Sequence, residues 1–484
     1  MDVEYTRREY CSAILMDRRL GLGAEEKDLL IKVVYLFGLK GVVVRATGDL
    51  LNEFCMSDAV FRKARNLLMR KGYLAEHQVL NGRKGRPQKG FCIGQKLISH
   101  IEAYLVKQKP EEGEYLLESQ GLIDELLKPD ISKSRVGLTS QKAPRPPVRI
   151  LMSVLLAHAD EIGVVISLGH ADLRKLTGME RDRLVFQVSK LRALGFLRAY
   201  VPGITGGKLL GSVRGVYVLN RAWGGFESKV TPFVSTFYNP LEGKGQFQST
   251  EAYNLYAQAR EIKSDKANDS ENRGKVLVRH LLGNRTPNVC LFPAFKRTAS
   301  MADFFLDSSS IKLVEVLQWK IERYACIFLN EHWLKLSYKD EFVDERLLNE
   351  IASELLPARI IKVDDKDESL EREVQRELVR FIYGISHSIA VYIKGNIHFA
   401  GLTDKRAGLP YHKMNHLLLP KVMDKDLKSF CLLSFMKSGK NKEATVGQAV
   451  LINETNGHTS DVSLVDSMED VSGEIKTKYG FECL

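Results

Sequence analysis

Hydrophobic residues recur at helical spacing in two separate stretches of the first half of the chain. They are Leu30, Val33, Val34 and Phe37 in the first stretch, and Ile150, Leu151, Val154 and Leu155 in the second. Apolar positions three or four residues apart are typical of a helix with one face in a core. A run of β-branched residues follows each stretch, beginning at Val42 and at Val164. The pattern predicts helices over 27–37 and 148–159, each followed by a short strand.

These two stretches begin a longer internal repeat. Asp49-Leu50 recurs as Asp172-Leu173, Met56 as Met179, Leu68 as Leu191, and Gly72-Tyr73-Leu74 as Gly195-Phe196-Leu197, all at an offset of 123 residues. In each copy a short helix, over 50–54 or 173–177, precedes a longer helix, over 57–71 or 180–194. The Gly-aromatic-Leu sequence then leads into two strands joined by a glycine-rich loop. Duplicated units of supersecondary structure are the simplest explanation.

The positive charge of the chain is concentrated in the two copies. The formal net charge is +11. Residues 40–109 contain 14 Lys and Arg against 5 Asp and Glu, a net of +9, and residues 145–223 contain 12 against 5, a net of +7. The remainder is therefore net acidic. Two basic blocks favour two sites for a polyanion, although lysine-rich solvated surfaces would give the same count.

The order of helix, strand, helix, helix and two-stranded hairpin resembles the winged helix-turn-helix family. The resemblance rests on the strand followed by Asp-Leu, the long polar-faced helix and the Gly-aromatic-Leu before the hairpin. It covers residues 27–94 and 147–220. It implies an α+β fold class, with two winged helix-turn-helix domains followed by a mixed α+β C-terminal domain. It also implies that the second helix of each turn enters the major groove of double-stranded DNA.

The chain then divides into six segments. They are an N-terminal segment (1–26), winged-helix domain 1 (27–109), an acidic helix and basic Pro-rich linker (110–146), winged-helix domain 2 (147–223), a C-terminal α+β domain (231–437) and a flexible polar tail (438–484). In the C-terminal domain we expect helices over 310–336, 344–356 and 369–383, and a β-hairpin over 388–402 that turns at Lys394-Gly395-Asn396. The linker either follows a phosphate backbone between two modules or simply separates them.

The exposed faces of the two long helices supply the predicted base contacts. Behind an N-cap at Ser57, the first helix is expected to bury Val60, Phe61, Ala64, Leu67 and Leu68 and to expose Arg62, Lys63, Asn66 and Arg70. Arg and Lys suit guanine and phosphate, and Asn suits adenine. The second is expected to bury Leu184, Val185, Val188 and Leu191 and to expose Arg181, Arg183, Gln187 and Lys190. Because Glu180 is a poor N-cap and the apolar pattern is shifted by one residue, phosphate contacts or protein pairing are alternatives for this helix.

The hairpin loops supply further candidates for DNA binding. They are Arg83, Lys84, Arg86 and Lys89 in the first loop, and Lys208 and Arg214 in the second. Asn81-Gly82 predicts a tight turn, and Lys84-Gly85-Arg86-Pro87 is similar to the core of AT-hook peptides, with Lys in place of the first Arg. Arg86 would enter a narrow A·T minor groove or make a loose phosphate contact. Residues 203–209 are not a phosphate-binding loop, because Leu209 stands where Ser or Thr must hold magnesium.

The C-terminal half offers little recognisable chemistry. His412 and His416 would share one face of a helix, but no glutamate or third ligand accompanies them. Glu474-Ile475-Lys476, with Asp461 or Asp466 upstream, resembles the acidic-x-Lys strand of metal-dependent nucleases, but it stands in a polar context without a strand pair. We therefore expect no catalytic residue, metal or cofactor, and an enzyme is not favoured.

Composition narrows the class of protein. The chain has 484 residues, of which 44% are hydrophobic and 27% charged, a globular balance that suits several domains. Its seven scattered cysteines predict reduced thiols, and no apolar run reaches the roughly 20 residues of a membrane-spanning helix. The charged N-terminus lacks the apolar stretch of a secretory signal. We expect a cytoplasmic, DNA-associated protein (nuclear in a eukaryote) without a membrane partner.

These features together predict a sequence-specific double-stranded DNA-binding protein. We expect a transcriptional regulator whose C-terminal domain binds a protein partner or itself. One alternative is a replication initiator of a plasmid or mobile element, since such proteins also carry two winged helices in one chain. A second is a DNA-targeted enzyme with its activity in the C-terminal half, and a third is a scaffold whose winged helices bind protein. Repeated sites near an origin, metal-dependent DNA cleavage and protein binding would distinguish them.

Overall fold

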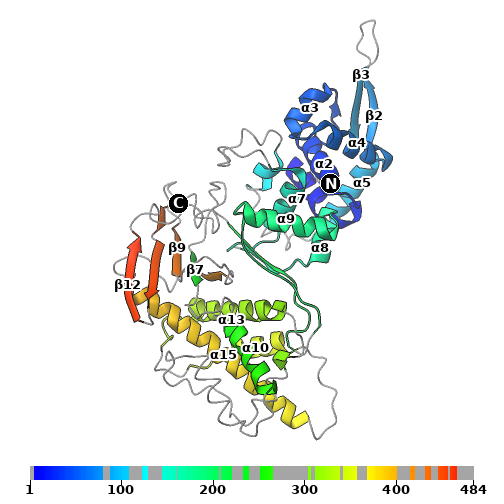
Figure 1. Ribbon diagram of the computed structural model, residues 1–484. Helices are drawn as coiled ribbons and strands as arrows, with labels where there is room; N and C mark the ends of the chain where they lie inside the picture. Colours follow the sequence, from blue (N-terminus) through cyan, green and yellow to red (C-terminus); the bar gives the residue numbers. More distant parts are fainter. Residues whose placement is uncertain are drawn as a thin grey trace. The chain divides into compact units, whose positions relative to one another are not determined.

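The computed structural model divides the chain into two compact units, one centred on Met1–Arg198 and the other on Val230–Ser472 together with Ala199–Val216. The fold is a mostly helical α+β fold that includes two small three-stranded antiparallel sheets (Figure 1). The described residues are 5–79, 88–107, 121, 123–128, 144–160, 162–206, 209–220, 233–238, 251–264, 304–306, 311–337, 342–356, 368–399, 415–419, 431–437, 445–447, 449–455 and 458–465. Among them, no helix combines the length and apolar character that crossing a bilayer requires.

The first repeat runs from α2 to β3. Its elements are α2 (Ala24–Phe37), β1 (Val42–Val43), α3 (Thr47–Phe54), α4 (Asp58–Arg70), β2 (Leu74–Val79) and β3 (Gln88–Ile93). The strands form a sheet in the order β1-β3-β2. Strands β2 and β3 form an antiparallel ribbon beside α4, paired from Leu74 opposite Ile93 to Val79 opposite Gln88 (Figure 1).

The second repeat has the same order of elements. It consists of α7 (Pro146–Leu156), β4 (Val164–Val165), α8 (His170–Thr177), α9 (Arg181–Ala193), β5 (Leu197–Val201) and β6 (Val216–Leu219). Its sheet order, β4-β6-β5, corresponds to that of the first repeat. The internal repeat in the sequence is therefore confirmed as a repeat of helices and strands.

A shared turn ends the long helix of each repeat. Gly72 and Gly195 have positive φ angles of 74° and 71°, which glycine adopts without a Cβ clash. After Gly72, the N–H of Tyr73 donates to the carbonyl of Leu68 at 2.9 Å, and the corresponding bond of the second repeat measures 3.1 Å. These bonds return to the last turn of the helix and satisfy its free carbonyl groups. The Gly-aromatic-Leu sequence thus ends one element and starts the next in both repeats.

The helices of the two repeats pack against each other within the first unit. Helix α2 contacts α7, and the N-terminal helix α1 (Arg7–Met16) contacts α2, α5 (Gln95–Lys107), α7 and α8. The approach is close at Gly178 (φ +64°), where an added Cβ would lie 2.0 Å from the carbonyl oxygen of Leu22. Residues 1–26, expected as a separate segment, therefore contribute a helix to this unit, and α2 begins at Ala24. In the acidic segment Ile123 and Leu126 are buried, whereas most of the Pro-rich linker lies outside the described residues.

The second unit combines long helices with strands. The helices include α10 (Glu251–Ser264), α13 (Ile311–His332), α14 (Glu345–Leu355) and α15 (Glu368–Phe399). Strands β7 (Phe233–Tyr238), β8 (Asn415–Leu419), β9 (Cys431–Lys437) and β10 (Thr445–Gly447) form a sheet in the order β10-β9-β7-β8. Helix α13 contacts α10, α15 and β8. The helices expected over 310–336 and 344–356 are confirmed.

The β-hairpin expected over 388–402 is wrong, because α15 continues through this segment to Phe399. The β-branched residues that suggested strands, including Val391 and Ile393, are buried at helical positions. Lys394, expected in the turn, donates from Nζ to the carbonyls of Trp333 and Leu336 at 2.7 and 2.8 Å, just beyond the end of α13. Tertiary packing therefore outweighs the local strand preference.

The expectation of a flexible tail from residue 438 is also wrong for part of that segment. Strand β10 pairs with β9, and β11 (Ala449–Thr455) pairs with β12 (His458–Val465). The register sets Val450 opposite Leu464 and Ile452 opposite Val462. The apolar run Ala449–Ile452 and the alternating Val462 and Leu464 stand inside a polar, acidic stretch, so overall composition conceals these strands.

Candidate nucleic-acid interface

Helix α4 exposes the four residues expected to contact DNA on one face. They are Arg62, Lys63, Asn66 and Arg70. The opposite face buries Phe61, Ala64 and Leu68, while Val60 and Leu67 are half-buried. Ser57 occupies the N-cap position as expected, although its side chain makes no capping hydrogen bond. The amphipathic pattern thus places this basic and polar face where the sequence predicted it.

Two arginines of the first repeat form exposed ion pairs. Arg62 Nε donates to Asp58 Oδ1 at 2.8 Å, one turn away on α4, and Arg45 pairs with Glu53 at 2.6 Å. Exposed pairs of this kind contribute little to stability, since water screens both charges. A phosphate group arriving at this surface would therefore compete for these guanidinium groups at small cost.

The first hairpin loop falls largely outside the described residues. Arg83, Lys84 and Arg86 are among residues 80–87, so the AT-hook-like sequence stays a prediction. The backbone of Lys89 lies on β3 opposite Gln78. The ribbon ends at Val79 and Gln88, immediately before and after the loop that the Asn81-Gly82 turn predicts.

Helix α9 presents a different face from the one expected. Gln187 is buried, with 8% of its surface exposed and no hydrogen-bond partner for Oε1 among the described residues, so its predicted exposure is wrong. Val185, expected in the core, is 46% exposed, and Phe186 is 65% exposed. Leu184, Val188 and Leu191 define the buried face, and helical geometry places Gln187 on that face. The hydrophobic character of Val185 was therefore a misleading guide to the orientation of the helix.

The basic residues of α9 lie around this exposed face. Arg181 and Arg183 are exposed as expected, whereas Lys190 is half-buried. Arg183 forms an ion pair with Glu25 at the start of α2, within the first unit. Part of the predicted positive charge is therefore neutralised by the first repeat.

Part of the second hairpin loop lies within the described residues. Lys208 lies outside the described residues, and Arg214 is exposed. Leu209 and Leu210 are buried, and the N–H of Leu210 donates to the carbonyl of Leu355 at 2.7 Å. Ala199–Val216 groups with the second unit, and the Leu210 bond joins this loop to the last residue of α14. Arg214 is the remaining described basic candidate there.

A buried charge cluster joins the two repeats, and the sequence reading missed it. Arg149 on α7 forms a two-bond contact with Asp28 on α2, at 3.0 Å from Nε and 2.5 Å from Nη2, and both side chains are fully buried. Arg149 also donates to the carbonyl of Pro144 at 2.7 Å, and Lys32 lies 3.4 Å from Asp28. Burial opposes ionisation, but the charges of Arg149 and Lys32 hold the pKa of Asp28 below its usual value. A lone arginine in an apolar helix was the signal available in the sequence.

Lys27, which precedes Asp28 on α2, is a second buried cation. Its Nζ donates to the carbonyl of Leu15 at 2.9 Å, near the C-terminal end of α1. Burial lowers the pKa of Lys27 to about 7, and the charge of Asp17 offsets this only in part. The lysine therefore satisfies a free carbonyl at a helix end while its charged form is disfavoured.

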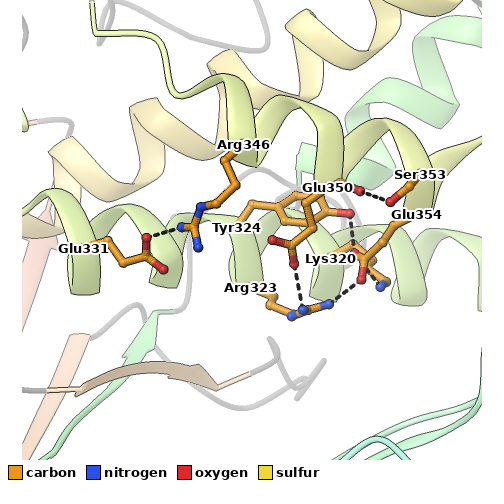
Figure 2. A network of polar contacts seen from close by, with 8 residues as sticks. All are labelled: Lys320, Arg323, Tyr324, Glu331, Arg346, Glu350, Ser353 and Glu354. Carbon is orange, nitrogen blue, oxygen red and sulfur yellow. Dashed lines mark hydrogen bonds and ion pairs between the residues drawn. The ribbon is translucent and has the colours of Figure 1, made fainter.

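Polar contacts in the second unit converge on Glu354 of α14, as Figure 2 shows. Its carboxylate accepts from Lys320 Nζ at 2.7 Å, Arg323 Nη1 at 2.7 Å and Tyr324 OH at 2.8 Å, all on α13. Burial raises the pKa of Glu354, but the bond from Lys320 and the charges of Arg323 and Lys320 outweigh it, so the pKa is lowered. These bonds fix α14 against α13.

Replacing Glu354 with alanine should lower the free energy of unfolding of the second unit by about 2–3 kcal/mol, because buried Lys320 loses its acceptor. Urea unfolding measures the change. Glu331→Ala is the matched control, since it breaks an exposed pair with Arg346 and should cost about 0–1 kcal/mol. Equal losses in the two variants would show that the Glu354 network does not hold the helices together.

The described residues contain one group with metal-ligand spacing, and protein contacts account for each member. Glu331, His332 and Asp344 place ligand atoms within 4.8 Å of one another. Glu331 pairs with Arg346, and Asp344 accepts from His332 Nε2 at 2.8 Å while capping α14. His416 lies on strand β8 and not on a helix, and it is a buried histidine stacked on Trp333, in agreement with its interpretation as an ordinary histidine. His412 and residues 466–484 lie outside the described part of the chain.

No protein-family model, no curated protein and no solved structure matches this chain.

Proposed function

We propose that the protein binds double-stranded DNA through two winged helix-turn-helix units and acts as a sequence-specific transcriptional regulator. The observation that carries the proposal is the duplicated order of elements and sheets, with an exposed face on α4 that bears Arg62, Lys63, Asn66 and Arg70. In such units the helix at this position reads base edges in the major groove, and the hairpin loop contacts phosphate or the minor groove. The net charge of +9 over residues 40–109 supports an anionic partner.

The contact between the two repeats affects how the protein would bind two DNA half-sites. If only a linker joined the repeats, each would bind DNA separately, and binding of the first would raise the effective concentration of the second. Because the buried Arg149–Asp28 pair joins α2 to α7, we infer a fixed separation between the two repeats. The protein would then favour one spacing of two half-sites. A replication initiator is the second candidate, since two joined units in one chain also suit repeated origin sites.

A salt titration of binding to a labelled duplex tests the proposal. Binding by Lys and Arg releases counterions from DNA, so the logarithm of the association constant should fall linearly with the logarithm of salt concentration. Fluorescence anisotropy of the full chain with the duplex measures this slope. An absence of binding at low salt would overturn the proposal.

The roles of the two predicted reading elements in the first repeat can be separated by mutation. Lys63→Ala with Asn66→Ala should relax base preference by about 1–3 kcal/mol per contact, since each removes a base-edge bond. Arg86→Ala should mainly weaken binding to duplexes with A·T-rich flanks. Competition binding with matched and mismatched duplexes measures both effects. If the variants bound every duplex with the same affinity as the parent, these side chains would not contribute to DNA recognition.

A further inference from the structure

We infer that Phe186 of α9 reads the methyl group of thymine in the DNA half-site of the second repeat. The inference rests on the proposed function and gives it a specific ligand group. It begins from the corrected orientation of α9, in which Gln187 is buried and Phe186 is 65% exposed. Its neighbour Val185 is 46% exposed as well, so α9 presents two adjacent apolar side chains outside its buried face.

The exposed stripe of α9 has a definite composition. Opposite the buried residues lie Asp182, Phe186, Ser189 and Ala193, all exposed and separated by four, three and four residues. This spacing puts them on one line along the helix. The stripe thus offers one carboxylate, one aromatic ring, one hydroxyl and one methyl group, with no basic residue at its centre.

Basic residues flank the stripe on both sides. Arg181 and Arg192 lie on one side, and Arg183, which pairs with Glu25, and the half-buried Lys190 lie on the other. A helix in the major groove has base edges in front of it and a phosphate backbone on each side. The arrangement of charge therefore matches duplex DNA.

The chemistry of the stripe selects particular bases. Thymine alone among the four bases presents a methyl group in the major groove, and Phe is one of the side chains that contact it. Asp182, in the first turn of α9, can accept from the amino group of cytosine. Helix α4 has Asn66 and Arg62 on its exposed face instead, so the two half-sites should differ in sequence. The second half-site is expected to contain thymine, preceded or followed by cytosine.

Replacing thymine with uracil tests the inference, because uracil lacks only that methyl group. A duplex enriched from a randomised pool by the full chain is resynthesised with uracil at each thymine in turn. At one or two adjacent positions the parent should bind about fourfold more weakly per methyl lost, as roughly 0.8 kcal/mol per buried carbon implies. The variant Phe186→Ala should bind the thymine and uracil duplexes equally, while Phe186→Leu should keep part of the difference. An unchanged melting temperature would show that the exposed position leaves the fold intact.

The possible results separate the inference from the proposed function. Duplex binding with no uracil-sensitive position, or with the same sensitivity in Phe186→Ala, would overturn the inference and leave the proposed function standing. If Phe186→Ala instead abolished a dimer seen by sedimentation, with unchanged DNA binding, the stripe would be a protein-docking surface. Failure of the full chain to bind any duplex would overturn both.

Discussion

Replacing Arg149 with alanine should lower the free energy of unfolding of the first unit by about 3–5 kcal/mol. The change leaves Asp28 fully buried beside Lys32, at 3.4 Å, and frees the carbonyl of Pro144. An uncompensated buried charge costs far more than an exposed pair contributes. Because this pair joins α2 to α7, the loss should destabilise both repeats together. Urea unfolding at neutral pH, followed by circular dichroism, measures it.

The first unit supplies a matched control for Arg149. Arg18, in the N-terminal segment before α2, pairs with Asp172 of the second repeat at 3.0 Å, but its side chain is 46% exposed. Arg18→Ala should therefore cost about 0–1 kcal/mol. The account of the junction would be wrong if Arg149→Ala were as mild as Arg18→Ala.

The free energy of unfolding should rise with pH above about 7, and Lys27 should account for a large part of the rise. Its pKa is lowered from 10.5 to about 7 by burial, so between these values the unfolded chain binds more protons than the folded chain. Under that condition stability increases with pH, by up to about 1.4 kcal/mol per pH unit for one proton. Lys32, whose pKa burial lowers to about 8, acts with the same sign.

Lys27→Met removes this titration and should flatten the pH dependence by about 1 kcal/mol per pH unit between pH 7 and 10. Urea unfolding at several pH values in this range gives the slope. Lys63→Met, at an exposed position of α4, is the control for the loss of a lysine. Equal slopes in the parent and in Lys27→Met would show that Lys27 is not held in a desolvated site.

Local patterns predicted the first repeat well. The face of α4 follows from apolar residues at regular spacing, and the turn at Gly72 follows from a helix that must end before a strand. Helix α9 was harder, because Val185 and Phe186 are hydrophobic yet exposed, while Gln187 is polar yet buried. A residue's hydrophobicity alone does not fix the orientation of a helix when neighbouring positions conflict with the period set by the others.

Contacts between residues far apart in the chain account for the structural features that the sequence did not predict. Asp28 and Arg149 are 121 residues apart, and neither identifies its partner until α2 and α7 meet. The segment around Lys394 reads as a turn until its amine reaches the carbonyls beyond α13. In both places tertiary contacts stabilise a residue in a setting that its neighbours in the chain do not predict.

Selection from a randomised duplex pool by the purified full chain, at a low and a higher salt concentration, tests the central claim most directly. We predict enrichment of a two-part motif with one fixed spacing, whose halves differ and whose binding weakens as salt increases. The fixed spacing follows from the packing of α2 on α7, and the differing halves follow from the faces of α4 and α9. Binding that disappears with salt and enriches no motif would contradict sequence-specific recognition by the two repeats.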